Sequence, residues 1–346
     1  MAERQQIDIS TASIFRGIML ILLFVLLYLV SDVLVILLFA IVIASAVSPF
    51  VAWFEKRGIP RIVGVLILYL MVIGLAIVLS SLIIPSVSSD LSGLGTYLPK
   101  VTQQLSTSLD KVQKGSPKYF DFVGEIQNIL DVLSSYLQQF SQSALNLVVS
   151  AFGGLFSFIA VIIISFYLSI QKKGIENFLA SVVPERFESY VVDLWKRVEL
   201  KVGFWLQGQL LLALIMGLLV YIGLSLLKVK FALLLAILAM IMEIVPVAGP
   251  VLAAIPAILI ALIQQPSLAL WVTIFYVVAQ QFENHVLVPV VLGKTTGLNA
   301  VVVILSIMIG FQLSGVVGGL LGVPVATIIV EILDDMVRLK SSRRSA

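Results

Sequence analysis

Two glutamates in otherwise apolar sequence are the residues best placed to do chemistry. Glu243 interrupts the apolar run 231–263 and is followed by Pro246, Gly249 and Pro250. A carboxylate at the centre of a spanning helix costs about 2.5–3.5 kcal/mol on insertion scales, and each proline removes a backbone donor. Broken backbone at membrane depth survives only where protein buries it or where it lines a watery cavity. The run therefore predicts two half-helices that meet at a substrate or ion site.

A second polar break lies further along the chain. Glu283 and Asn284 belong to the polar run 280–285, which Pro289 and Gly293 follow. We predict an irregular segment here, in which Glu283 and Asn284 join the binding site while Pro289 and Gly293 serve helix packing or gating. A structural role is the alternative: Glu243 would cap freed backbone amides, and Glu283 would simply be solvated at a helix end.

Four glycines near the end of the chain have a spacing that favours helix packing. Gly315 with Gly319, and Gly318 with Gly322, have the small-xxx-small spacing that lets membrane helices approach closely. We predict that these four glycines serve helix packing or gating. Glu331, one turn before two aspartates, is interpreted as a solvated residue near the cytoplasmic surface.

Enzyme chemistry finds little support. The chain has no cysteine, one histidine, and neither an HExxH nor a GxSxG motif, so we expect no enzyme, no cofactor and no metal site. No nucleotide-binding loop is present, which argues against an ATP-driven pump. A net charge of +3, scattered along 346 residues, does not suggest a nucleic-acid partner.

Composition places these residues in a membrane protein. Hydrophobic residues make up 60% of the chain, charged residues 12%, and the mean hydropathy is +1.13. We predict an all-α integral membrane protein with about eight transmembrane helices, one of them a broken or re-entrant hairpin. The apolar segments, judged against the roughly 20 residues that cross a bilayer, cover about 14–30, 33–53, 62–84, 145–170, 207–227, 231–263, 267–283, 299–313 and 316–337.

Two polar regions separate these segments. Leucines and valines recur at helical spacing on either side of a turn in 86–142, which predicts an extracytoplasmic amphipathic helical hairpin. A basic amphipathic helix with tryptophans is predicted at 184–206, lying on the cytoplasmic membrane surface or acting as a lever. The sequence thus divides into four parts, which are an N-terminal three-helix segment (1–85), the outer hairpin (86–142), a fourth span with its cytoplasmic helix (143–206) and a transport core with a basic tail (207–346).

Lysines and arginines set the expected orientation. Most of them fall on one side if the third span ends at Pro85 and both termini are cytoplasmic. A re-entrant hairpin and a tight pair of spans at 231–263 both return the chain to the same side of the membrane. The charge distribution is therefore the same for both, and the sequence leaves that choice open.

Three stretches together resemble the autoinducer-2 exporter family, also known as PerM-like permeases. They are EIVPVAGPVLAAIPAIL (243–259), FENHVLVPVVLGKTTGLNAVVVILSIMIG (282–310) and LSGVVGGLLGVPVATII (313–329). The resemblance implies a multi-pass protein of the bacterial inner membrane and secondary transport. It also implies a homo-oligomer, for which a pentameric ring is one option, and export of a small polar autoinducer-2-like solute or sodium(lithium)/proton antiport.

Three hypotheses follow. The first is an exporter of a small polar molecule, the second a sodium(lithium)/proton antiporter that uses the same carboxylates, and the third a membrane scaffold without transport activity. The expected partners are a small polar solute or a cation or proton, the lipid bilayer and further copies of the chain.

Overall fold

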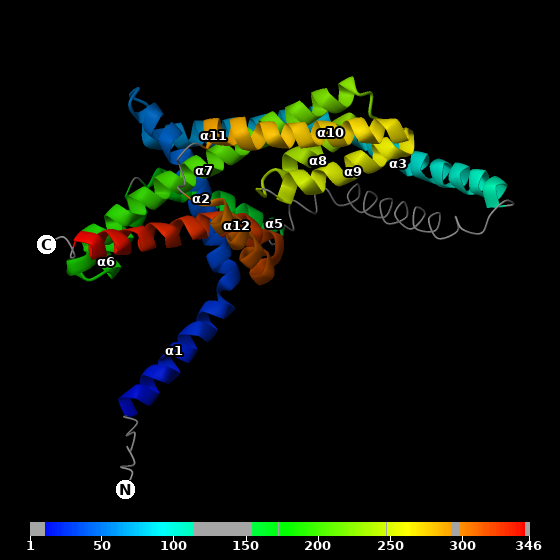
Figure 1. Cartoon of the computed structure of the whole chain (residues 1–346). Coiled ribbons are helices and arrows are strands. Elements are labelled where there is room, and N and C mark those ends of the chain that lie inside the picture. Colours follow the sequence, from blue (N-terminus) through cyan, green and yellow to red (C-terminus); the bar gives the residue numbers. More distant parts are fainter. Residues whose placement is uncertain (1–10, 114–153, 172, 247, 293–297, 343–346) are drawn as a thin grey trace, which may run out of the picture.

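Every regular element that the structure describes is a helix, as the sequence predicted. The structure is a computed structural model that describes residues 11–113, 154–171, 173–246, 248–292 and 298–342. Long helices cross one another in Figure 1, while α1 and the far end of α3 extend away from the rest. In chain order the helices are α1 (Thr11–Leu29), α2 (Ser31–Glu55), α3 (Arg61–Gln113), α5 (Leu155–Ile170), α6 (Gly174–Val182), α7 (Glu185–Leu226), α8 (Ala232–Met242), α9 (Ala248–Gln264), α10 (Pro266–Phe282), the π-helix η2 (Glu283–Leu287), α11 (Val288–Val291) and α12 (Ala300–Ser342).

Four of the described helices are long and apolar enough to cross a membrane. They lie at Ser31–Glu55, Arg61–Ser86, Glu185–Leu226 and Val301–Arg338, and the bent pair α5–α6 makes a fifth if it counts as one span. Shorter apolar helices at Phe15–Leu29, Ala232–Met242 and Ala248–Gln264 accompany them. The chain is therefore a multi-pass membrane protein, and the figure of about eight spans stays a prediction.

Helix α3 is longer than its apolar part. The predicted end of the apolar segment at Pro85 is confirmed, since the span Arg61–Ser86 stops there, but the helix itself continues to Gln113. Proline removes one backbone donor, but the turns on either side keep their own hydrogen bonds and the helix survives. The first helix of the predicted outer hairpin is thus an extension of α3. Its second helix lies outside the described residues.

Helix α7 corrects the prediction of a separate surface helix at 184–206. That stretch and the following span form one helix of 42 residues, about 63 Å long at 1.5 Å per residue. Its apolar stripe packs inside the protein, where Val198, Val202 and Trp205 are buried against α2 and α12. The helix therefore extends well beyond a bilayer core of about 30 Å, in keeping with the lever interpretation rather than the surface-lying one.

The hairpin of α8 and α9 packs against α7 and α10 around an apolar core. Its two ends meet at one base, because the Gln264 side-chain amide donates to the Lys228 carbonyl at 2.9 Å and accepts from the Lys230 N–H at 3.1 Å. Helix α8 has 11 residues and is about 16 Å long, too short for a core of about 30 Å. The geometry favours the re-entrant form that the sequence left open.

Candidate functional site

The break between α8 and α9 is held by close backbone contact. Gly249 lies so near the end of α8 that a Cβ atom there would come within 1.9 Å of the Met242 carbonyl oxygen. The Val245 N–H donates to that same carbonyl at 3.0 Å, and the Gly249 N–H donates to the Val245 carbonyl at 3.0 Å. Only glycine fits such an approach, so the turn that presents Glu243 depends on this residue.

The second break is a π-helix. Helix α10 ends at Phe282, and Glu283–Leu287 follows as a single π-helical segment before the short α11. A π-turn carries one extra residue per hydrogen-bonded ring, which redirects the side chains around it, and such turns are frequent at functional sites. The irregular segment predicted around Glu283 is confirmed, and Pro289 stands in the first turn of α11.

The two breaks bring Glu243 and Glu283 together. Their side chains are hydrogen-bonded to each other, and only 2% and 4% of their surfaces are exposed. The Gln280 amide donates to the second oxygen of the Glu283 carboxyl at 3.1 Å. Within the described residues, neither glutamate forms an ion pair with a lysine or arginine.

This arrangement has a direct chemical consequence. An ionised carboxylate only accepts hydrogen bonds, so two carboxyl groups can bond to each other only when at least one carries a proton. Two adjacent carboxylates cannot both ionise without strong repulsion, least of all in a buried site. The pair is therefore built to hold a proton between two residues 40 positions apart in sequence.

Gln209 of α7 is a member of the site that the sequence did not point out. It is 2% exposed, and its amide donates to the main-chain carbonyl of Glu243. Gln209 thus satisfies a carbonyl that the break freed, while the Glu243 side chain bonds to Glu283. This division of labour supports a binding role for Glu243 rather than a cap. One signal was available: Gln207 and Gln209 are two amides at the start of the apolar segment 207–227.

The remaining predicted site residues differ in burial and in their distance along the chain from Glu243. Gly249 and Pro250 are buried in the break and Pro246 is half-buried, all next to Glu243. The side chains of Asn284 and Pro289 are exposed. Gly293 lies outside the described residues.

The predicted glycines lie where α12 folds back on itself. Gly315 takes a left-handed conformation with φ of 58°, and with Ser314 it forms a kink within the element. A Cβ on Gly318 would lie 2.0 Å from the Gly310 carbonyl oxygen, and one on Gly322 would lie 2.4 Å from that of Ser306. Gly319 packs against the Phe311 ring. These glycines hold the two halves of α12 in backbone contact.

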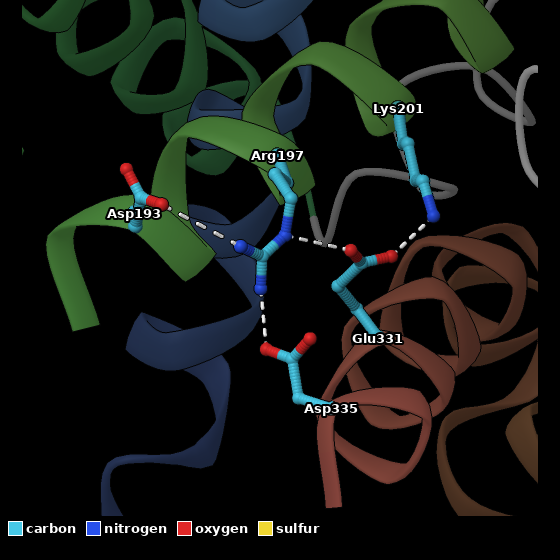
Figure 2. A network of polar contacts seen from close by, with 5 residues as sticks. All are labelled: Asp193, Arg197, Lys201, Glu331 and Asp335. Atoms are coloured by element: carbon cyan, nitrogen blue, oxygen red, sulfur yellow. Dashed lines mark hydrogen bonds and ion pairs between the residues drawn. The ribbon is translucent and has the colours of Figure 1, made fainter. Parts of the chain in front are cut away.

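A network of charges joins α7 to the last part of α12 (Figure 2). The Arg197 guanidinium donates to Glu331 at 2.8 Å and to Asp335, and Lys201 donates to the other oxygen of Glu331. Asp193 adds a weaker contact to Arg197 at 3.7 Å. The interpretation of Glu331 as solvated is wrong, since the residue is 6% exposed and has two cationic partners.

Among the described residues, no group of three or more histidine, aspartate or glutamate side chains could hold a metal ion.

Comparison with known proteins identifies the family. The model of the AI-2E family transporter matches residues 18–338. The chain is 29% identical over 306 residues to YueF of Bacillus subtilis, which is named provisionally as a transport protein, and the match covers 86% of this chain and 82% of YueF. A protein of Synechocystis, also named provisionally as a transport protein, is 32% identical over 308 residues, with 86% of this chain and 76% of that protein covered.

A third relative has a more specific name. TqsA of Escherichia coli K12, named AI-2 transport protein, is 26% identical over 305 residues, and the match covers 87% of this chain and 85% of TqsA. The chain belongs to the AI-2E transporter family, as the three sequence stretches suggested. Membership in a family of transporters points to a membrane transporter rather than an enzyme.

Proposed function

We propose that this member of the AI-2E transporter family is a proton-coupled secondary transporter that exports a small polar molecule. The observation that carries the proposal is the buried pair Glu243–Glu283, which is hydrogen-bonded and has no cationic partner among the described residues. A static structural role would not require two acids at the meeting point of two broken helices.

The pair can couple two movements because it must always be neutralised in part. If its proton leaves, two carboxylates stay close together in an apolar setting, which is strongly unfavourable. A solute that donates hydroxyl hydrogen bonds, or a cation, can replace the proton and relieve that repulsion. Exchange of the proton for the cargo is then favoured over loss of either one alone. In this proposal the hairpin α8–α9 moves relative to α7 and α10 and so opens or closes the site.

The substrate class is supported by chemistry and by one relative. Carboxylates and amides such as Gln280 suit a small solute with several hydroxyl groups, because they accept and donate hydrogen bonds at fixed positions. The name of TqsA refers to AI-2 transport. We therefore favour an autoinducer-2-like solute, moved out of the cell.

Sodium(lithium)/proton antiport is the second candidate. Carboxylate oxygens are suitable ligands for hard cations, and a carboxyl pair can exchange a proton for such an ion. The third candidate, a scaffold without transport activity, leaves the buried acid pair without a purpose.

Reconstitution in liposomes distinguishes these functions. We would measure proton flux together with efflux of a labelled furanone diol, and separately with an imposed sodium or lithium gradient. Glu243→Gln and Glu283→Gln keep the size and hydrogen bonding of the pair but remove its proton. Glu188→Gln, an exposed position on α7, serves as the matched control.

We expect solute efflux that carries protons inward, lost in both site variants and kept in the control. Proton flux driven by sodium or lithium without solute movement would favour antiport. Solute movement unaffected by Glu243→Gln and Glu283→Gln would contradict the role of the pair.

Orientation and assembly belong to the same proposal. We infer a location in the bacterial inner membrane with both termini in the cytoplasm, supported by the distribution of lysines and arginines. We also propose a homo-oligomer, a pentamer by resemblance, because α1 extends away from the other helices in Figure 1 and packs little against its own chain. Cross-linking in native membranes tests the assembly.

A further inference from the structure

Tyr276 of α10 presents an unexplained polar group. It is 8% exposed, and its hydroxyl is the one buried side-chain polar atom in the described part of the chain without a hydrogen-bond partner. Buried hydroxyls are nearly always paired, because an unmade hydrogen bond is expensive in an apolar environment. We therefore expect the Tyr276 hydroxyl to gain a hydrogen-bond partner in another conformation of the protein.

The position of Tyr276 relates it to the carboxyl pair. Tyr276, Gln280 and Glu283 are spaced four and three residues apart, so they lie on one face of α10. The helical rise puts Tyr276 about 10 Å from Glu283 along the helix axis. It lies toward Pro266, the end of α10 next to Gln264 and thus to the hairpin base. By the predicted orientation, that base is on the extracytoplasmic side.

The apolar core that contains Tyr276 combines larger side chains, such as Leu224, Leu235 and Ile260, with small ones. Its buried members include six alanines on α8, α9 and α10, which are Ala236, Ala239, Ala253, Ala257, Ala261 and Ala269. An alanine side chain buries less apolar surface than a leucine or isoleucine, so parting the helices at these positions exposes less apolar area than parting them at larger side chains. Gln264 joins the two ends of the hairpin at the base through two hydrogen bonds.

We propose that this alanine-rich core between α7, α8, α9 and α10 opens as the outward branch of the transport route, and that the Tyr276 hydroxyl hydrogen-bonds water that enters it. The inference rests on the proposed function, because it supplies the step between the carboxyl pair and the outer side. In the closed form described by the structure the branch is packed and the hydroxyl is unpaired. In the open form, water enters and the hydroxyl gains its partner.

Cysteine accessibility tests the opening. The chain contains no cysteine, so Ala257→Cys and Ala40→Cys each introduce a single thiol at a site with 0% exposure. Ala257 lies in the proposed branch and Ala40 in the interior of α2. A charged, membrane-impermeant thiosulfonate reagent is added outside intact cells, and the labelled fraction is followed with time.

We expect the thiol at position 257 to react at least about 10-fold faster than the one at position 40, because a local opening is far more frequent than global unfolding. Equal rates would overturn the proposal. Labelling requires neither a known substrate nor a proton gradient. If the site variants Glu243→Gln and Glu283→Gln keep full transport while position 257 labels fast, the proton role fails and the outward branch stands.

A second variant tests the hydroxyl itself. Tyr276→Phe removes only the unpaired group, and Tyr221→Phe, at an exposed tyrosine of α7, is its control. We expect Tyr276→Phe to keep or raise the thermal midpoint while transport falls about 2- to 10-fold, the range that one hydrogen bond accounts for. Unchanged transport would overturn the role of the hydroxyl. So would a lowered midpoint, which would reveal a structural partner.

Discussion

The carboxyl pair and the charge network bury the same kind of residue in opposite ways. Glu331 has Arg197 and Lys201 as partners, so its negative charge is balanced inside the protein. Among the described residues, the carboxyl groups of Glu243 and Glu283 contact each other and the Gln280 amide but no cation, so a proton must provide the balance. Fixed cations hold a carboxylate in one state, whereas a shared proton can leave. The charge network therefore stabilises the structure, whereas the carboxyl pair can exchange ions.

The largest expected effect comes from giving the pair a fixed cation. Gln280→Lys would place an ammonium group beside Glu283, where the amide now donates at 3.1 Å. An ion pair at about 4 Å contributes about 4 kcal/mol at an effective dielectric constant of about 20, so transport should fall about 100-fold or more. Liposome flux measures this.

Gln281→Lys is the matched control, since this neighbouring glutamine is exposed. It should retain transport. Normal flux in Gln280→Lys would show that the pair does not need to release a proton.

The next effect concerns the backbone that presents Glu243. Gly249→Ala would force a Cβ atom against the Met242 carbonyl, 1.9 Å away. We expect much reduced folded yield and loss of transport. A Cβ atom has a fixed position on the backbone, so no change of rotamer can relieve its clash with a main-chain carbonyl. Gly74→Ala on α3, with no atom within 4 Å of the new Cβ, should behave as wild type. Size-exclusion profiles and flux decide between these outcomes, and a normal Gly249→Ala protein would disprove the close turn.

A smaller effect is expected in the charge network. Arg197→Met removes two donors from Glu331 and Asp335, at a side chain that is still 35% exposed. Charge-assisted hydrogen bonds contribute about 1.5–3 kcal/mol each when buried, so partial exposure should limit the loss to about 1–2 kcal/mol. Thermal unfolding measures it. Arg186→Met, on the exposed start of α7, is the control. A variant that lost transport at temperatures where it stays folded would make the network part of the transport site.

Salt should give the smallest effect and should act on one region only. Raising the salt concentration screens partly exposed ion pairs and leaves a buried, proton-sharing pair untouched. We expect the thermal midpoint of the wild type to fall by about 1–3 °C, and this dependence to shrink in Arg197→Met. An equal salt response in both proteins would show that the network contributes nothing measurable.

The sequence predicted the two breaks because their signals are local. Glutamate, proline and glycine within an apolar run report a broken helix wherever the rest of the chain lies, and this held at Glu243 and Glu283. The contact between these two glutamates is tertiary, and no spacing within either segment could report it. Gln209 was missed for the same reason, since its partner is 34 residues away.

The errors have physical causes too. Glu331 was expected to be solvated because it stands near other acids at the end of a span, yet its cations come from α7, at least 130 positions earlier. Near position 206 the side chains change from polar to apolar, but the backbone conformation stays helical. Charged residues make the same main-chain hydrogen bonds as apolar ones, so α7 continues through it.

The central claim is that Glu243 and Glu283 share one exchangeable proton, and difference infrared spectroscopy of the reconstituted protein tests it most directly. The carbonyl stretch of a protonated carboxyl group reports the proton itself. We predict such a band in the wild type, its loss in both Glu243→Gln and Glu283→Gln, and its persistence in Glu331→Gln. The band should vanish in either single variant because a glutamine amide can donate to the remaining carboxylate without a proton. A band that survives in either variant, or that is absent from the wild type, would contradict the account.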